Sequence, residues 1–178
     1  MADKMDAIAM LKADHRKVEE LFEKFEKAKS DSVKKALVEQ ICTELSVHAT
    51  IEEEIFYPAC NGQIEEDLLE EAYVEHDGAK VMIAELMQSE PGADFYDAKV
   101  KVLSEEIKHH VKEEEKRAEG MFAQAREAGL DMDALGEQMA VRKQQLLAEI
   151  KSGGLPAPKT RSFSGHKLEQ SAPVEAAV

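Results

Sequence analysis

The sequence has no tryptophan and few other aromatic residues, with 3 tyrosines and 6 phenylalanines among 178 residues. Ala, Leu, Glu, Lys, Met and Gln dominate it, and these side chains lose little rotamer freedom in a helix because none is branched at Cβ. The composition therefore favours helices over a sheet. The length suits one domain with an appendage better than two independent cores. We predict an all-α protein.

Long apolar runs are also missing. No stretch approaches the roughly 20 consecutive apolar residues that a helix needs to span a bilayer. The first residues, MADKMDAIAMLKADH, lack the continuous apolar stretch of a secretory signal. We therefore expect a cytoplasmic protein with no membrane partner.

Cysteine is scarce, and the two cysteines form no metal or redox motif. Cys42 and Cys60 lie on or just past one predicted helix. At a rise of ~1.5 Å per residue they would be about 27 Å apart, which is far beyond disulfide reach. We expect both to be reduced thiols.

Positive charge is in the minority, because 23 Lys and Arg residues stand against 37 Asp and Glu residues. The formal net charge is -14 and the pI is near 4.9. Proteins that bind nucleic acids or anionic membranes rely on Lys and Arg to replace counterions. The charge balance therefore argues against nucleic acid as a partner.

Apolar residues recur every three or four positions over five segments, which is the spacing of amphipathic helices. Ser30 can cap the second segment, Pro91 breaks the chain after the third, and Gly129 stops the fourth. The fifth begins at a cap provided by Asp131 or Asp133. The predicted helices cover residues 3–28, 31 to about 60, 64–89, 94–128 and 131–151.

The first four predicted helices should form a bundle. Connections of a few residues make consecutive helices antiparallel, so we predict an up-down-up-down four-helix bundle over residues 1–128. An additional C-terminal helix follows over residues 129–152. Residues 153–178 combine glycines and prolines with small polar residues, and we predict a flexible tail without a core of its own. What that helix and tail contact stays open.

Each bundle helix carries one histidine within its apolar stripe. The first two histidines are 33 residues apart and the last two are 34 apart, and the second of each pair is followed four residues later by glutamate. In antiparallel helices these spacings bring the side chains to one level of the bundle. The six residues are His15, His48, Glu52, His76, His110 and Glu114.

These residue types at this spacing suit a dinuclear metal site. Residues four apart share a helix face, so each His-x-x-x-Glu step aims an imidazole and a carboxylate into the same space. Neutral imidazoles bind iron, zinc, copper and nickel, and the two oxygens of a carboxylate can bridge two ions. Two buried carboxylates without cations would be costly, because they lose the solvation of water. A single histidine on an apolar face is more often a core residue than a ligand, so the prediction depends on all six together.

Periodicity also separates the candidates from their neighbours. His109 is followed by a glutamate at the same distance as His110 is, but it falls among charged residues, so we expect it to be solvated. Of the three consecutive glutamates from 52 to 54, only Glu52 continues the apolar line of its helix.

The segments LKADHRKVEELF, LSVHATIEEEIFYPAC, EHDGAK and IKHHVKEEE resemble the haemerythrin-like, or HHE cation-binding, domain, over about residues 5–125. The resemblance implies a non-haem di-iron centre, bridged by an oxygen species and two carboxylates, that binds or senses oxygen, peroxide, nitric oxide or iron. On this chain it assigns the terminal ligands to His15, His48, His76 and His110 and the bridges to Glu52 and Glu114.

The chain departs from the oxygen-carrying haemerythrins at two ligand positions. Their third helix resembles this one but offers a second histidine four residues on, where this chain has Lys80. Their fourth-helix carboxylate is an aspartate five residues after its histidine, whereas Glu114 follows His110 by four. The emptier coordination shell leaves room for water, peroxide or a tyrosine, either Tyr57 or Tyr73. This weakens the case for reversible oxygen carriage.

Three functions compete. The leading hypothesis is a metal-binding protein whose di-iron site binds or senses a small oxidant or diatomic ligand. An alternative is a di-iron oxidoreductase of catalase-like type, with peroxide-dismutating or oxidase turnover, although no separate acid-base pair or substrate pocket is visible. The third is a metal-free helical interaction protein, which metal analysis would separate from the others. Ferritin-like iron storage is disfavoured, because it predicts Glu-x-x-His steps.

Overall fold

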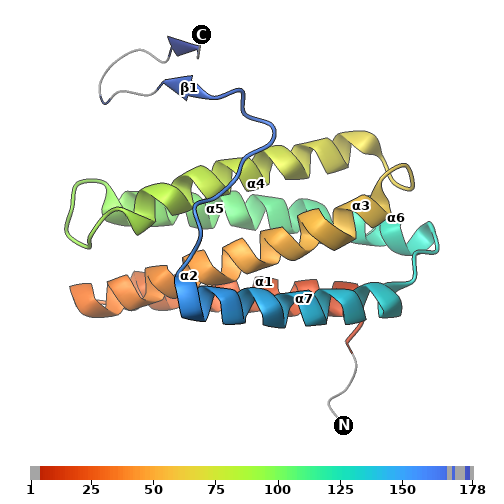
Figure 1. Ribbon diagram of the computed structural model, residues 1–178, viewed down its shortest axis with the longest axis horizontal. Coiled ribbons are helices and arrows are strands. Elements are labelled where there is room, and N and C mark those ends of the chain that lie inside the picture. The colour runs from red at the N-terminus through yellow and green to blue at the C-terminus, as the bar shows by residue number, and fades with distance from the viewer. Residues whose placement is uncertain (1–4, 168–169, 171–174, 177–178) are drawn as a thin grey trace.

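The structure is a computed structural model that describes residues 5–167, 170 and 175–176 (Figure 1). Its elements in chain order are α1 (Ala7–Lys27), α2 (Asp31–Ile51), the π-helix η1 (Glu52–Phe56), α3 (Tyr57–Cys60), α4 (Glu66–Met87), α5 (Tyr96–Glu115), α6 (Met121–Glu127), α7 (Met132–Gly153), β1 (His166–Lys167) and β2 (Glu175–Ala176). The two short strands pair antiparallel, with His166 opposite Ala176. The predicted all-α class is confirmed.

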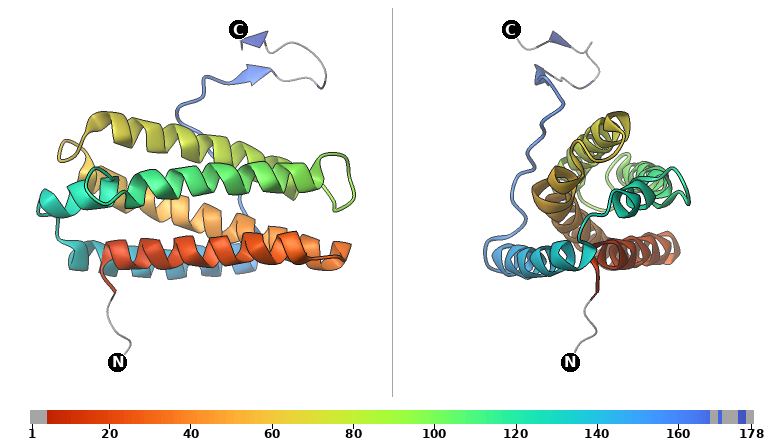
Figure 2. Two further views of the ribbon diagram at one scale, coloured as in Figure 1. Left: turned by 180° about the vertical axis from the view of Figure 1, so that it is seen from behind. Right: turned by 90° about the vertical axis from the view of Figure 1, so that its right-hand side faces the viewer.

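Four long helices, α1, α2, α4 and α5, form a bundle in which consecutive members run in opposite directions (Figures 1 and 2). α1 packs against α2, α4 packs against α5, and contacts between α2 and α4 join the two pairs. α7 lies outside this bundle, along α1 and α2 (Figure 2, right). The predicted up-down-up-down bundle with an additional C-terminal helix is therefore confirmed. The flexibility of the tail stays a prediction.

Short polar side chains start three of the helices. Asp6, Ser30 and Asp131 each accept a hydrogen bond from the backbone N–H three residues later, at 2.7, 3.3 and 3.0 Å. Each cap satisfies a donor that the first helical turn leaves free. The predicted caps at Ser30 and Asp131 are confirmed. α1 begins at Ala7, and residues 3 and 4 of its predicted range lie outside the described residues.

The prediction of one continuous helix over residues 94–128 is wrong, because α5 ends at Glu115 and a turn separates it from α6. At Gly120 in that turn, a Cβ atom would lie 2.6 Å from the carbonyl oxygen of Lys116, so only glycine fits. The apolar spacing of the sequence does not mark this turn. Because the chain turns here, α6 packs against α5 and places Phe122 in the core.

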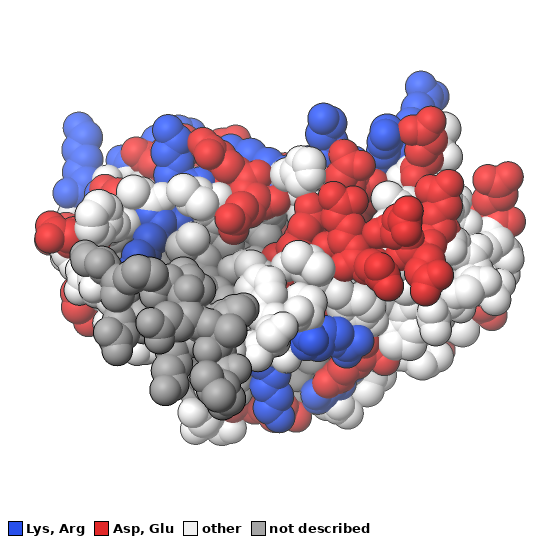
Figure 3. Space-filling view, turned by 90° about the horizontal axis from the view of Figure 1, so that it is seen from above, with Lys and Arg blue, Asp and Glu red and all other residues white. Residues whose placement is uncertain are grey.

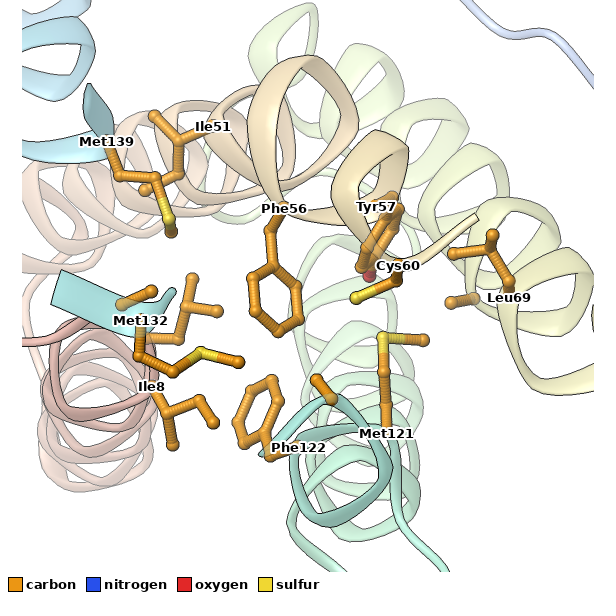
Figure 4. Packing of buried hydrophobic residues seen from close by; sticks show 14 of the residues in the cluster. Ile8, Ile51, Phe56, Tyr57, Cys60, Leu69, Met121, Phe122, Met132 and Met139 are labelled. Atoms are coloured by element: carbon orange, nitrogen blue, oxygen red, sulfur yellow. The ribbon is translucent and has the colours of Figure 1, made fainter. Parts of the chain in front are cut away.

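Two clusters of buried apolar residues fill the two ends of the bundle. Figure 4 shows the cluster that holds Phe56 and Phe122, whose rings meet edge to face at 5.7 Å between centroids. Met132 and Met139 of α7 belong to the same cluster, so the additional helix supplies part of the core. Between the two clusters the bundle carries buried polar side chains.

The surface is strongly acidic. Figure 3 shows Asp and Glu side chains crowded over α4 and α5, toward the end where α4 begins. Within the described residues, no helix combines the length and the apolar character needed to cross a membrane. Such a surface attracts cations and repels polyanions.

Candidate metal centre

The structure brings the six predicted residues together at mid-height in the bundle. The Nε2 atoms of His15 and His48 are 3.2 Å apart, and those of His76 and His110 are also 3.2 Å apart. All six side chains are buried, with exposed fractions of 3% for His15, 6% for His48, 0% for Glu52, 4% for His76, 4% for His110 and 2% for Glu114.

Each of the two glutamates contacts one histidine of the first pair and one histidine of the second pair. Oε2 of Glu52 lies 3.2 Å from Nε2 of His48 and 3.3 Å from Nε2 of His76. Oε2 of Glu114 lies 3.3 Å from Nε2 of His15, and Oε1 lies 3.5 Å from Nε2 of His110. Glu114 thus presents one oxygen to each pair, whereas Glu52 presents the same oxygen to both. The six residues form two groups in which the possible ligand atoms all lie within 4.8 Å of one another, and Glu52 belongs to both. One group is His15, His48, Glu52 and Glu114, and the other is Glu52, His76 and His110.

A second layer of carboxylates lies behind the histidines, and the sequence patterns did not reveal it. The Nδ1 atom of every histidine in the site faces an Asp or Glu, so the Nε2 atom points into the centre. A carboxylate in this position fixes the ring orientation of a metal ligand and raises its basicity. Three pairs are hydrogen-bonded: His15 with Glu115 at 2.7 Å, His76 with Glu53 at 3.0 Å and His110 with Glu75 at 2.7 Å. Asp14 lies 3.6 Å from Nδ1 of His48, beyond hydrogen-bond distance.

Cations hold three of these outer carboxylates in turn. Arg16 lies 2.6 Å from Glu115, Lys80 lies 2.7 Å from Glu53, and Lys143 of α7 pairs with Asp14. All four carboxylates come from a different helix than the histidine they face, which explains why spacing along one helix could not predict them. Glu53 follows Glu52 directly, and the periodicity preferred Glu52 as the ligand; the structure gives Glu53 a place in the outer layer, with only 14% of its side chain exposed.

The chain widens into the π-helix η1 at the glutamate of the first His-x-x-x-Glu step. π-Helical turns are rare and frequently occur at functional sites. Directly after η1, the hydroxyl of Tyr57 lies 3.1 Å from Oε1 of Glu114, 3.2 Å from Nε2 of His76 and 3.4 Å from Oε2 of Glu52. Tyr73 packs edge to face on the Tyr57 ring, at 5.2 Å between centroids. Of the two tyrosines considered, Tyr57 therefore places its hydroxyl in the centre.

Two buried oxygens of the centre have no hydrogen-bond partner. They are Oε1 of Glu52 and Oε2 of Glu114, whose 3.3 Å approach to Nε2 of His15 does not have hydrogen-bond geometry. A buried carboxylate oxygen without a donor is costly, and in native proteins such atoms usually face water or a cation. Together with four imidazole nitrogens, these oxygens make a donor set that fits two divalent or trivalent cations.

In the metal-free protein the same contacts favour charged imidazoles. Burial alone would lower the pKa of His48, but the charge of Glu52 and the contact with Asp14 raise it to about 10. Burial also opposes the charge of His76, yet Glu52 and Glu53 raise its pKa to about 9. Burial would raise the pKa of Glu52, but His48 and His76 hold it well below its usual range. Protons therefore occupy the Nε2 atoms of His48 and His76, and metal binding there must release them.

The phenol of Tyr57 stays protonated beside these groups. Burial, and then the charges of Glu114 and Glu52, raise the pKa of Tyr57 well above its ordinary value. A protonated phenol can donate a hydrogen bond to a carboxylate or to a ligand in the centre.

The periodicity arguments about neighbouring residues agree with the geometry. His110 is buried in the centre, whereas 57% of the His109 side chain is exposed and its Nε2 lies 3.4 Å from Glu75. Glu52 is fully buried and Glu54 is exposed, where it pairs with Arg142 of α7.

A cavity of about 70 Å³ adjoins the centre, and all four histidines line it. Most of its remaining wall is apolar, from side chains such as Val18, Leu45 and Ile83. Pro158, from the segment after α7, lies at its edge. The centre therefore has an adjoining space for a small molecule.

Comparisons with known proteins agree with this geometry. Residues 6–122 match the hemerythrin HHE cation binding domain. A hemerythrin HHE cation binding domain-containing protein from Mycobacterium kansasii has a similar crystal structure, with a TM-score of 0.71 at 24% identity over 85% of this chain and 95% of that chain. A DNA nickase from a Nostoc species is 27% identical over 106 residues, which are 60% of this chain and 30% of the nickase. The chain thus spans less than a third of that relative.

Proposed function

The chain belongs to the hemerythrin HHE cation binding domain family, and from this premise we propose that its buried centre holds two iron ions and binds or senses a small oxidant or diatomic ligand. One observation carries the proposal. Each of two buried glutamates contacts one histidine of both pairs, and each keeps a buried oxygen without a hydrogen-bond partner. Cations at those oxygens would satisfy the geometry and the charge together.

The residues divide between the two ions by their contacts. His15 and His48 would bind one ion, and His76 and His110 the other. Glu52 and Glu114 would span both. An iron pair with open coordination positions supplies one-electron and two-electron chemistry and binds small ligands. The protein's own contribution is to orient the imidazoles through the outer carboxylates and to offer the Tyr57 hydroxyl as a donor 3.1 Å from Glu114.

The adjoining cavity supports the choice of ligand class. It offers about 70 Å³ to the centres of water-sized molecules, and a cavity needs only about 10–15 Å³ by the same measure to hold one water. A diatomic molecule or a peroxide fits such a space. The apolar wall favours an uncharged ligand.

Metal analysis with an absorption spectrum tests the proposal. Freshly purified protein, or protein reconstituted with ferrous iron under argon, should contain two irons per chain and should show near-ultraviolet oxo-to-iron bands after exposure to air. A metal-free helical interaction protein would retain no stoichiometric metal under the same conditions. Binding of zinc but not iron would leave the centre intact and overturn the oxidant chemistry.

Turnover of peroxide is a second candidate, and the position of Tyr57 favours it. Dismutation converts two hydrogen peroxide molecules into two waters and one oxygen molecule, so protons must be delivered beside the metal centre. A buried phenol in contact with Glu114, Glu52 and His76 is a suitable relay. Oxygen release from peroxide, measured with an electrode, would support an enzyme. Ligand binding without oxygen release would support a sensor.

Nucleic acid is not a partner in our proposal, although one relative is a DNA nickase. The formal net charge is -14, and the acidic face in Figure 3 would repel phosphates. The chain spans 30% of that relative. We further propose a cytoplasmic location, where both buried cysteines would stay reduced.

A further inference from the structure

The segment that follows α7, residues 154–165, crosses α2 and α4 and reaches the edge of the metal cavity (Figure 1). We propose that this segment, called the strap below, covers the access to the centre and decides which ligands reach it. The inference rests on the proposed function for the identity of those ligands. The claim that the strap covers the access does not depend on that function, because it rests on contacts between the strap and the bundle.

One buried carboxylate fastens the strap to α4. Oδ2 of Asp77 accepts hydrogen bonds from the backbone N–H of Arg161 at 2.8 Å and of Ser162 at 2.6 Å, and from the hydroxyl of Ser162 at 2.7 Å. The side chain of Asp77 is fully buried. Hydrogen bonds to a charged acceptor are stronger than those between neutral groups. We call this group of contacts the latch.

Two further contacts place the strap on either side of the cavity. The guanidinium of Arg161 lies 4.2 Å from the centroid of the Tyr73 ring, which is a cation–π distance. At the other end, Leu155 packs against the apolar cluster that fills the bundle beyond the centre. The strap is therefore held at both ends and spans the region between them.

Pro158 lies in that span and is the strap residue that lines the cavity. Its neighbours there include Ser46 and Thr50 of α2 and Lys80 of α4, so the mouth lies between these two helices. Proline fixes φ and offers no N–H that would need a partner at an apolar mouth. With Pro156 two residues earlier, it keeps this stretch extended.

The strap has the properties of a cover that can lift. Apart from Leu155, its side chains are exposed, so little apolar surface holds it down. It begins at Gly154, where φ is 80° and the chain leaves α7. Glycine adopts this left-handed conformation without strain and can act as a pivot. Lifting the strap breaks mainly the three hydrogen bonds of the latch.

The latch also adjoins the metal ligands. Lys80 lies 3.1 Å from Asp77 and 2.7 Å from Glu53, and Glu53 faces Nδ1 of His76 at 3.0 Å. Substituting Asp77 would therefore disturb the centre as well as the strap. A clean test must change the strap itself.

Ser162→Asp places a carboxylate against Asp77 and should open the latch by repulsion. Ser164→Asp is the matched control, because it adds the same charge to the strap at an exposed position. In the metal-free protein, the Arg161 and Ser162 amides should be protected from hydrogen exchange in the wild type and in Ser164→Asp, but not in Ser162→Asp. Carbethoxylation of the cavity histidines by diethylpyrocarbonate, read by mass spectrometry, should be about tenfold faster in Ser162→Asp, since losing about 1.4 kcal/mol of latch stability is a factor of 10.

Iron-loaded protein gives the second readout. In Ser162→Asp, the bulky chelator ferrozine should remove iron faster than in the wild type, by about the same factor as the labelling. The association rate of nitric oxide should change less, because a diatomic molecule passes the closed strap more easily. Unprotected amides at 161 and 162 in the wild type would overturn the proposal, as would equal labelling of the histidines in both variants. Failure of the protein to load iron would instead overturn the proposed function, and the labelling test of the strap would still stand.

Discussion

Glu53 faces Nδ1 of His76 at 3.0 Å, across the space between η1 and α4. Lys80 holds the same carboxylate oxygen at 2.7 Å. The imidazole is thereby fixed with Nε2 toward Glu52, at 3.3 Å. The centre is built in two layers, and the outer layer determines how the inner ligands are presented.

Replacing Glu53 should therefore weaken metal binding although Glu53 itself is not a ligand. We expect Glu53→Gln to reduce metal affinity by about tenfold, the lower end of the range for outer partners of metal-ligating histidines. Glu54→Gln is the control, because Glu54 is exposed and pairs with Arg142 instead. Competition titrations with a chromophoric chelator measure both affinities. Equal affinities of the two variants would contradict the positioning role.

His110 and His109 are adjacent in sequence but occupy different environments, so they form a matched pair. His110→Ala should abolish stoichiometric binding of at least one metal ion, because it removes an imidazole at 3.2 Å from that of His76. His109→Ala should leave the metal content intact, since 57% of that side chain is exposed. Metal analysis of the two purified variants decides, and equal losses would refute the assignment.

The sequence was sufficient to group the six inner residues and insufficient to find the outer carboxylates. Two His-x-x-x-Glu steps lie on single helices, where spacing dictates that the side chains share a face. Asp14, Glu75 and Glu115 face histidines of other helices, and such pairs depend on how helices rotate against one another. Spacing along one chain segment contains no such information.

The irregular backbone was also beyond prediction. The apolar stripe of the fourth helix continues past residue 115, yet the chain turns there, and the backbone of the turn leaves no room for a side chain at Gly120. The docking of the strap depends on Asp77. In the sequence, nothing distinguishes Asp77 from the many other acidic residues, although it directly follows His76. Both features are tertiary contacts that overrule local preference.

The stability of the metal-free protein should fall at alkaline pH. Folding raises the pKa of His48 from an ordinary 6.5 to about 10 and that of His76 to about 9. A raised pKa means that the folded state binds the proton more tightly, so this stabilisation is complete below pH 6.5 and is lost as pH rises through 9 to 10. The lowered pKa of Glu52 acts oppositely, and its contribution is lost in acid.

Thermal unfolding between pH 5 and 10, in the presence of a chelator, measures this dependence. The melting temperature should decline steadily above about pH 6.5, the ordinary pKa of histidine. Iron-loaded protein should decline less, because its imidazoles are already neutral, and metal affinity should rise over the same range. A metal-free melting temperature that increases toward pH 9 would contradict the pairing of these histidines with Glu52.

The two central glutamates link metal binding to stability, and one double variant tests them. Glu52→Gln with Glu114→Gln keeps volume and hydrogen-bonding capacity but removes both charges that face the cations. Saturating iron should stabilise the wild type by about 2.7 kcal/mol at a hundredfold excess over Kd, which is roughly 5 to 10 °C for a chain of this size. The double variant should lose most of this shift. It should also lose part of the alkaline decline, because the charge of Glu52 that raises the pKa of His48 is gone while Asp14 remains. Calorimetry of both proteins, with and without ferrous iron, gives the four melting temperatures, and equal stabilisation by iron would mean that these glutamates do not bridge the metal ions.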